Sequence, residues 1–243
     1  IDGMATVNND LNTIQYNTVG IRPDNVAAAN AYHGIEINQR SNGNTIQNNI
    51  VTQNGIITPN GTYSSVLIGG PLTADESTGC ILFQNTIYKN IGRGIDILGN
   101  LSVNNRVSQN SIYDNGNASS STVSLPSFGI YCLGLDNDYD GTTLNDNKDP
   151  ATCPNGYSNF PVITGVAPGG AGCTQQISGS YNGLANTQYY VEVFASDVCN
   201  GDTAGTNYFA TAGYNYGEGI TYVGATSVFT TDVNGNGVWS LSV

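Results

Sequence analysis

The sequence predicts an all-β fold: a right-handed parallel β-helix, of the pectate-lyase-like solenoid type, followed by an antiparallel Ig-like β-sandwich. Three observations predict it: asparagines that recur at matched places in short apolar repeats, a later change to alternating strands, and a composition unsuited to helices. Only 10% of the 243 residues are charged, so the Glu/Lys faces of amphipathic helices are not expected. We place the β-helix at residues 1–150 and the sandwich at residues 151–243.

One short pattern of apolar residues around an asparagine recurs four times in the first part. The four asparagines are separated by 32, 36 and 25 residues, and they are Asn17, Asn49, Asn85 and Asn110. Because consecutive coils of a β-helix stack at about 4.8 Å, these side chains are expected to form a ladder at a turn. Stacked amides can bond to each other and to the turn backbone, which offsets the cost of burying them.

A second element alternates with the first and supplies the expected interior. It reads Gly34–Ile37, Val66–Gly69, Gly94–Ile97 and Gly129–Cys132. Stacking these segments predicts one interior row from Ile35, Ile95 and Ile130, with a second row beside it from Ile37, Ile97 and Cys132. A β-sandwich could also use short strands with Gly turns, but it would not return the same asparagine to the same place.

Near Asp149 the pattern changes to longer segments in which apolar and polar residues alternate. The expected strands are Asn159–Ile163, Gln175–Tyr181, Gln188–Ala195, Thr221–Thr230 and Gly237–Val243. Their hairpin-like intervals indicate an antiparallel sandwich. Trp239, the only tryptophan, is expected to anchor its core.

Several segments of this second part carry a family resemblance. They are Phe160–Ile163, Tyr189–Phe194, Cys199, Tyr216–Gly219 and Asp232–Gly237. They resemble a family of secreted bacterial surface proteins with β-helix repeats, often with a CSLREA signature near the N-terminus. The resemblance covers residues 90–243 and extends to the junction between Gly129 and Pro161. It implies an extracellular, multidomain bacterial protein at the cell surface, and it supplies no catalytic residues.

The two ends of the sequence suggest an incomplete fold. Family sandwiches continue with another strand after the position of Val243, and Ile1 begins inside patterned structure, as in a processed piece of a longer precursor. Uncapped coils and unpaired strands invite pairing. Either flanking residues of the longer protein complete these ends, or neighbouring subunits do so by stacking or strand donation, as in a filament.

The net charge of the chain disfavours two classes of binding partner. A net charge of −12 disfavours nucleic acid, which needs clustered Lys and Arg, and it disfavours an anionic membrane surface. No apolar run reaches about 18 residues, so we expect no membrane span.

The five cysteines form no CxxC pair, so a zinc site is not expected. Scattered cysteines in an acidic, charge-poor chain rich in Gly and Asn indicate an oxidising compartment. We expect disulfides between Cys173 and Cys199 and between Cys132 and Cys153. The remaining Cys80 is expected to be a small buried hydrophobe.

A calcium site is the best candidate for chemistry. Residues 136–141 read Asp-Asn-Asp-Tyr-Asp-Gly, with oxygen ligands at alternating positions before a glycine, like the start of a calcium loop. The twelfth position is Asn147 instead of the bidentate Glu, so an EF-hand proper is not expected. The candidate ligands are Asp136, Asp138, Asp140, Asp146 and Asp149. A solvated acidic turn is the alternative.

Two sequence features could involve carbohydrate: glycosylation sequons and a cluster of tyrosines. Three N-x-[ST] sequons, at Asn60, Asn100 and Asn117, lie in loop-like stretches where glycosylation would be tolerated, although matches by chance are expected in an Asn-rich chain. A dense set of tyrosines in the second part could also stack on carbohydrate, although core packing explains most of them. These are Tyr208, Tyr214, Tyr216 and Tyr222.

An enzyme is the runner-up function, because β-helices host many enzymes that cleave polysaccharides. Glu36 and Asp96 occupy equivalent outward positions, about 10 Å apart if one coil lies between them, near the upper end of an inverting carboxylate pair. No Asp pair or Arg is seen to converge on them, and His33 reads as a solvated turn residue. We therefore predict a non-enzymatic, extracellular structural or adhesive protein, with a glycosidase or lyase as the alternative.

Overall fold

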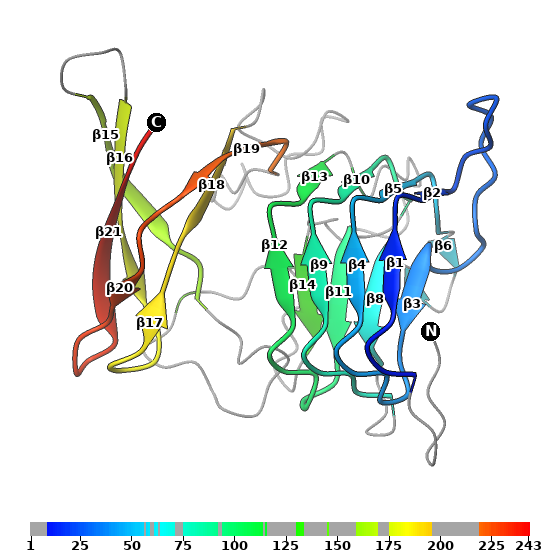
Figure 1. Ribbon diagram of the computed structural model, residues 1–243, viewed down its shortest axis with the longest axis horizontal. Coiled ribbons are helices and arrows are strands. Elements are labelled where there is room, and N and C mark those ends of the chain that lie inside the picture. The colour runs from blue at the N-terminus through cyan, green and yellow to red at the C-terminus, as the bar shows by residue number, and fades with distance from the viewer. Residues whose placement is uncertain are drawn as a thin grey trace.

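The computed structural model describes residues 9–55, 57–58, 61–62, 64–70, 75–91, 94–113, 115, 130–133, 145, 159–169, 175–195 and 219–243. These residues form strands, turns and bends, and none of them is helical. The prediction of an all-β chain is confirmed for them. Parallel strands occupy the N-terminal part and antiparallel strands the C-terminal part (Figure 1).

Three parallel sheets of four strands each make up the N-terminal part, which we call the solenoid. The first sheet contains β1 (Thr13–Gln15), β4 (Thr45–Gln47), β9 (Ile81–Phe83) and β12 (Arg106–Ser108). The second contains β2 (Thr18–Val19), β5 (Ile50–Thr52), β10 (Thr86–Tyr88) and β13 (Ser111–Tyr113). The third contains β3 (Ile35–Ile37), β8 (Val66–Gly69), β11 (Ile95–Leu98) and β14 (Ile130–Leu133). Each coil therefore adds one strand to each sheet, which is the β-helix-like arrangement that the repeats predict.

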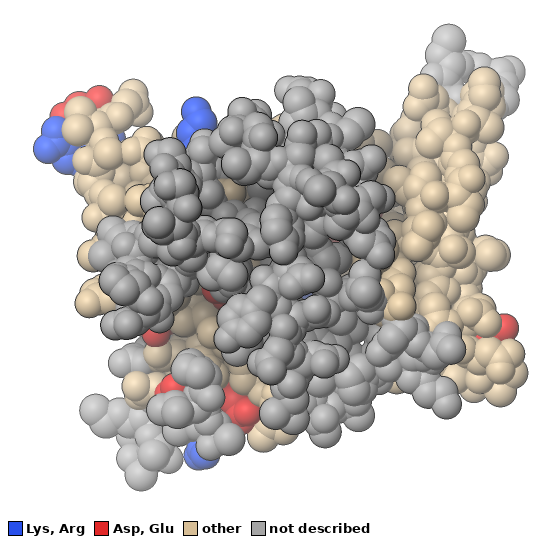
Figure 2. Space-filling model, turned by 180° about the vertical axis from the view of Figure 1, so that it is seen from behind, with Lys and Arg blue, Asp and Glu red and all other residues tan. Residues whose placement is uncertain are grey.

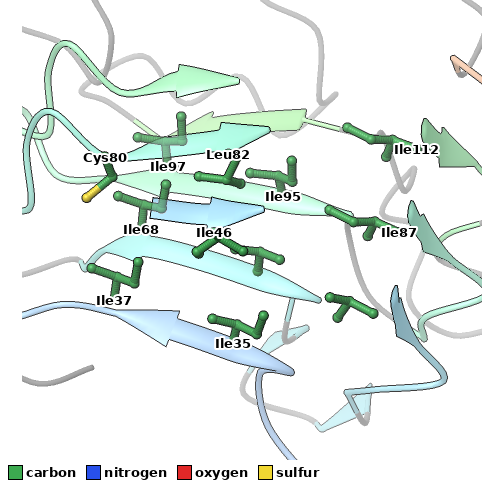
Figure 3. Packing of buried hydrophobic residues seen from close by; sticks show 12 residues of the cluster. Ile35, Ile37, Ile46, Ile68, Cys80, Leu82, Ile87, Ile95, Ile97 and Ile112 are labelled. Carbon is green, nitrogen blue, oxygen red and sulfur yellow. The ribbon is translucent and has the colours of Figure 1, made fainter. Parts of the chain in front are cut away.

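The solenoid core is built from rows of branched side chains in register. Ile35 aligns with Val66 and Val66 with Ile95, and all three are buried, so the predicted row is confirmed for them with Val66 inserted. The neighbouring row joins the buried Ile37, Ile68 and Ile97, and Ile130 and Cys132 take the next strand positions in register. Figure 3 shows Ile37, Ile68 and Ile97 one above another, with Ile46 and Leu82 across the interior. Burying each such side chain contributes about 1.5–3 kcal/mol.

The predicted asparagine ladder is present, and it clamps successive coils. The backbone N–H and the Nδ2 of Asn49 both donate to the Oδ1 of Asn85, at 3.0 Å each. The same pair of bonds joins Asn17 to Asn49 and Asn85 to Asn110. The Nδ2 of Asn85 also donates to the carbonyl of Ile46 in the preceding coil, at 2.8 Å. An amide that bonds to two coils at once is well satisfied although it is buried.

The residue before each ladder asparagine has a positive φ. Tyr16, Asn48, Gln84 and Gln109 have φ values between 54° and 58°. This left-handed conformation is unfavourable for residues other than glycine. It turns the chain sharply enough to aim the next side chain along the stack, and the ladder bonds offset its cost.

Two further ladders run parallel to the first. One joins Asn30, Asn54, Asn90 and Asn115, and each Nδ2 donates to the following Oδ1 at 2.8–3.2 Å. The other begins with Asn12 and Asn44, reaches Cys80, and continues to Asn105, whose Oδ1 accepts the N–H of Cys80 at 2.9 Å. Cys80 therefore stands where the repeat places an asparagine. It is fully buried and free, as the sequence predicts.

The C-terminal part, which we call the C-terminal module, is antiparallel. Its three-stranded sheet has the order β15 (Val162–Pro168), β16 (Gln175–Asn182), β21 (Asn236–Ser242). The module also contains two two-stranded antiparallel sheets. One pairs β17 (Gln188–Tyr189) with β20 (Phe229–Thr230), and the other pairs β18 (Glu192–Ala195) with β19 (Thr221–Ala225). Trp239 is buried with Ile177, Tyr181, Val191 and Val193, so its predicted role as a core residue is confirmed. A separate hairpin pairs β6 (Ile57–Thr58) with β7 (Gly61–Thr62).

The gap in the third ladder yields a stability prediction. The Nδ2 of Asn44 reaches only the carbonyl of Asn42, at 3.4 Å, whereas the equivalent atom of Asn49 has an Oδ1 partner in the next coil. Burial raises the pKa of the Cys80 thiol, which therefore stays neutral and is a poor substitute for an amide. We expect Cys80→Asn to restore the ladder and to raise the free energy of unfolding by about 1 kcal/mol.

Urea unfolding of the wild-type protein, Cys80→Asn and Cys80→Ala measures this effect. Cys80→Ala serves as the control, because it removes the sulfur without adding an amide and should be destabilised. A Cys80→Asn protein no more stable than Cys80→Ala would contradict the ladder assignment.

Candidate functional site

The C-terminal module covers the last coil of the solenoid. In Figure 1, β18 and β19 face the end formed by β12 and β13. The carboxylate of Glu192, on β18, accepts hydrogen bonds from the Ser108 hydroxyl at 2.5 Å and from the Gln109 backbone N–H at 2.8 Å. In the preceding coil, the equivalent N–H of Gln84 donates to the carbonyl of Ser108, at 3.3 Å. Glu192 thus takes the place of the carbonyl that a further coil would offer.

Backbone contacts complete this cap along β13. The N–H of Ile112 donates to the carbonyl of Gly219 at 2.8 Å, and the two residues form an isolated antiparallel bridge. The Ser111 hydroxyl donates to the carbonyl of Ile220 at 2.5 Å. In these four hydrogen bonds the donors lie on the solenoid and the oxygen acceptors lie on the module.

A cation–π contact lies beside the cap. The guanidinium carbon of Arg106, on β12, is 5.9 Å from the ring centroid of Tyr190. Such contacts contribute about 0.5–1 kcal/mol at exposed sites. The contact adds to the hydrogen bonds that hold the C-terminal module against the last coil.

The outer face of the third sheet carries the two carboxylates considered for catalysis. Glu36 aligns with Leu67 and Leu67 with Asp96, so one strand separates them, as the repeat predicts. Their environments differ, because Asp96 is 3% exposed whereas Glu36 is half-buried. Oε1 of Glu36 accepts a hydrogen bond from Nδ2 of Asn38 at 2.6 Å. A substrate would therefore reach the two carboxylates unequally.

His33 packs beside this face and is not the solvated residue that the sequence predicts. It is half-buried, and its Nδ1 lies 2.9 Å from the hydroxyl of Ser64 and 3.2 Å from the Ser64 backbone nitrogen. Burial lowers the pKa of His33, and the charge of Glu36 and a hydrogen bond to Ser64 oppose that shift. Ser64 is fully buried. The pair therefore reads as a packed structural contact between coils.

Aromatic residues also line the outer surface of the second sheet. Tyr88 and Tyr113, on adjacent coils, stack with ring centroids 5.3 Å apart and planes 12° apart. Of the tyrosines considered for sugar stacking, Tyr222 packs against Phe194 at 5.6 Å, and the other three lie outside the described residues. The Tyr88–Tyr113 pair is a stacked surface that the sequence analysis missed, although both tyrosines follow the repeat's isoleucine.

Most of the predicted site residues lie outside the described residues. This holds for the calcium candidates Asp136, Asp138, Asp140, Asp146 and Asp149, for the sequons at Asn60 and Asn117, and for Cys153, Cys173 and Cys199; Cys132 is described only as a strand position. Asn100 is described and lies half-buried in a turn. Ser102 of the same sequon is buried, and its Oγ accepts the N–H of Ser77 at 3.1 Å. Within the described ranges, no three His, Cys, Asp or Glu side chains gather to hold a metal.

Among the described residues, the C-terminal module has an exposed edge strand. β15 ends the three-stranded sheet, and all seven of its residues are exposed. Ile163 and Val166 align with Gly179 and Ile177, on the face that carries the module core, yet they are 57% and 61% exposed. A register shift between Ile163 and Gly165 interrupts the edge, as bulges do on edges that must resist pairing.

The described surface carries few charges. Figure 2 shows only small blue and red groups on the part of the rear face that is not grey. Among the described residues, the one ion pair joins Arg22 and Asp24 at 2.9 Å. None of these residues belongs to a helix that is long and apolar enough to cross a membrane.

Comparison with known proteins finds no match of either kind. No protein-family model matches the chain, and no curated protein matches it at a significant level.

The cap yields a first prediction at this site. Replacing Glu192 with Ala should lower the free energy of unfolding by about 1–3 kcal/mol, because the buried Ser108 hydroxyl and the half-buried Gln109 N–H lose their acceptor. Glu192→Gln keeps one carbonyl oxygen and should lose less. Asp24→Ala is a matched control on an exposed ion pair, where little change is expected. Hydrogen exchange at Gln109 and Ile112 gives the local readout; unchanged protection in Glu192→Ala would rule out the cap.

His33 yields a pH prediction. Its pKa in the folded state lies below the ordinary value of 6.5, so the unfolded chain binds a proton more readily. Its contribution to stability is therefore present above pH 6.5 and is lost as the pH falls toward the lowered pKa. His33 is the only histidine, and carboxylates titrate mainly near pH 4. Unfolding measured from pH 7 to pH 5 should show this loss in the wild-type protein and not in His33→Asn; equal slopes would contradict the assignment.

Proposed function

We propose that the protein is a non-enzymatic structural or adhesive part of an extracellular bacterial surface protein. In this proposal the solenoid is a right-handed, pectate-lyase-like β-helix and the C-terminal module is Ig-like. The observation that carries the proposal is the coil stack, clamped by buried amide ladders and closed at one end by Glu192. Such a stack is stiff along its axis, which suits a spacer or stalk.

The charge-poor surface and the family resemblance support a location outside the cell. Amides and hydroxyls replace charges on this surface, because only 10% of the residues are charged. The resemblance of residues 90–243 to CSLREA-type surface proteins favours a bacterial source. Disulfides Cys173–Cys199 and Cys132–Cys153, and glycans on Asn60, Asn100 or Asn117, belong to the same proposal and would suit an oxidising compartment.

Calcium is proposed as a stabilising ligand of the acidic segment. Five aspartates between residues 136 and 149 repel each other unless a cation neutralises them. A rise in Tm on adding calcium would support this role, and an unchanged Tm would count against it.

The proposed partners are neighbouring domains of a larger surface protein or further subunits, with carbohydrate as a possible target of adhesion. The stacked pair Tyr88–Tyr113 is the aromatic surface best suited to a sugar ring among the described residues. Polysaccharide cleavage remains the second candidate function, and the alignment of Glu36 with Asp96 on one outer face is the observation that favours it.

Two measurements test the proposed function. Immunogold labelling of intact source cells should place the protein on the outer surface, and negative-stain images of the purified protein should show elongated particles. Activity assays on acidic polysaccharides should show no turnover. Cleavage that is lost in a folded Glu36→Gln or Asp96→Asn variant would overturn the proposal in favour of the enzyme, and labelling confined to the cell interior would also overturn it.

A further inference from the structure

The solenoid has a second end, formed by β1, β2 and β3. Each of these strands is the outermost member of its sheet, and together they lie on the side away from the C-terminal module (Figure 1). None of the described residues pairs with their outer edges. Ile14 and Val19 are only partly buried there, whereas Ile46 and Val51, one coil further in, are fully buried. Within the described residues, the core row therefore extends to this edge.

The ladders give this edge a defined hydrogen-bonding polarity. Where two asparagines meet, the backbone N–H and the Nδ2 of one donate to the Oδ1 of the asparagine in the following coil. The first members of the three ladders are Asn12, Asn17 and Asn30, and each donates forward in this way. The Oδ1 atoms of these three residues accept no hydrogen bond from any described residue. The open end thus presents acceptors at its turns.

The capped end shows the complementary chemistry. There the last coil presents donors, and the module meets them with the Glu192 carboxylate and the carbonyls of Gly219 and Ile220. The open end needs the reverse, a partner that presents N–H groups in step with the turns. A preceding coil with asparagines would supply both the backbone N–H and the Nδ2 at each turn.

The same polarity disfavours a second copy of this chain at the open end. Two open ends brought together would both present the Oδ1 acceptors of Asn12, Asn17 and Asn30, and neither would supply a row of ladder N–H donors. The opposite end of a second copy is covered at β12 and β13 by its own module. Neither arrangement satisfies the acceptors.

We propose that the edge formed by β1, β2 and β3 is a docking edge for the terminal coil of another parallel solenoid module, one that carries asparagine at the ladder positions. This deepens the proposed function and rests on it, because it names the kind of neighbour that completes the structure. Docking adds one strand to each sheet and one amide to each ladder, and it covers Ile14 and Val19.

A peptide that copies residues 43–55 tests this edge, because it carries ladder asparagines at 44, 49 and 54 together with the sequences of β4 and β5. Fluorescence anisotropy of the labelled peptide with the full chain should show saturable binding. A control peptide with alanine at those three positions should bind at least about tenfold more weakly, since a tenfold change corresponds to about 1.4 kcal/mol, the loss of roughly one hydrogen bond.

Two variants of the full chain place the peptide on the edge. Asn17→Leu removes an edge acceptor and should weaken binding about tenfold, whereas Asn234→Leu, on an exposed turn of the C-terminal module, should bind as the wild-type protein does. Circular dichroism checks that both variants are folded. No binding of the asparagine peptide, equal binding of the two peptides, or equal binding by Asn17→Leu would each overturn the proposal. The surface location would stand or fall separately by immunogold labelling.

Discussion

The structure depends on hydrogen bonds between side-chain amides of successive coils. A chain with 10% charged residues and short strands of two to four residues in its solenoid has little else to fix one coil on the next. Branched apolar side chains supply the burial energy, but hydrophobic contact is not directional and would tolerate slipped registers. The asparagine bonds are directional, and each buried amide left without a partner costs about 1–3 kcal/mol. The ladders therefore fix the register of the coils, and the isoleucine side chains pack in that register.

Directionality at the turns also explains how the two parts of the chain meet. Each Oδ1 accepts only from the preceding coil, so the ladder turns offer free donors at one end of the solenoid and free Oδ1 acceptors at the other. The C-terminal module meets the donor end with a carboxylate and two carbonyl oxygens. A carboxylate accepts several hydrogen bonds at once, so a single Glu192 can satisfy a turn that would otherwise need another coil.

Much of this architecture could be predicted from the sequence, because asparagines and isoleucines recur at matched positions in the repeats. The ladder through Asn49 and Asn85 and the row through Ile35 and Ile95 follow from spacing alone. The ladder through Asn44 is interrupted by Cys80, which hides it from a simple alignment. The ladder through Asn54 begins at Asn30, 24 residues earlier, whereas Asn17 and Asn49 are 32 residues apart, so the spacing does not reveal it either. The cap by Glu192 could not be predicted, because it joins residues 84 positions apart across two kinds of fold. His33 was wrongly predicted to be solvated. It packs against Ser64, which is 31 residues away, and a contact so distant in the chain leaves no pattern in the sequence around His33.

A double-mutant cycle on Asn49 and Asn85 tests the central claim most directly. The two side chains contact each other through the ladder bond, and each is only 1% exposed. The free energies of unfolding of Asn49→Ala, Asn85→Ala and the double variant give their coupling. If amide bonds hold the coils in register, the coupling should be about 1 kcal/mol or more. Additive losses, with a coupling near zero, would mean that apolar packing alone holds the stack and would contradict the account.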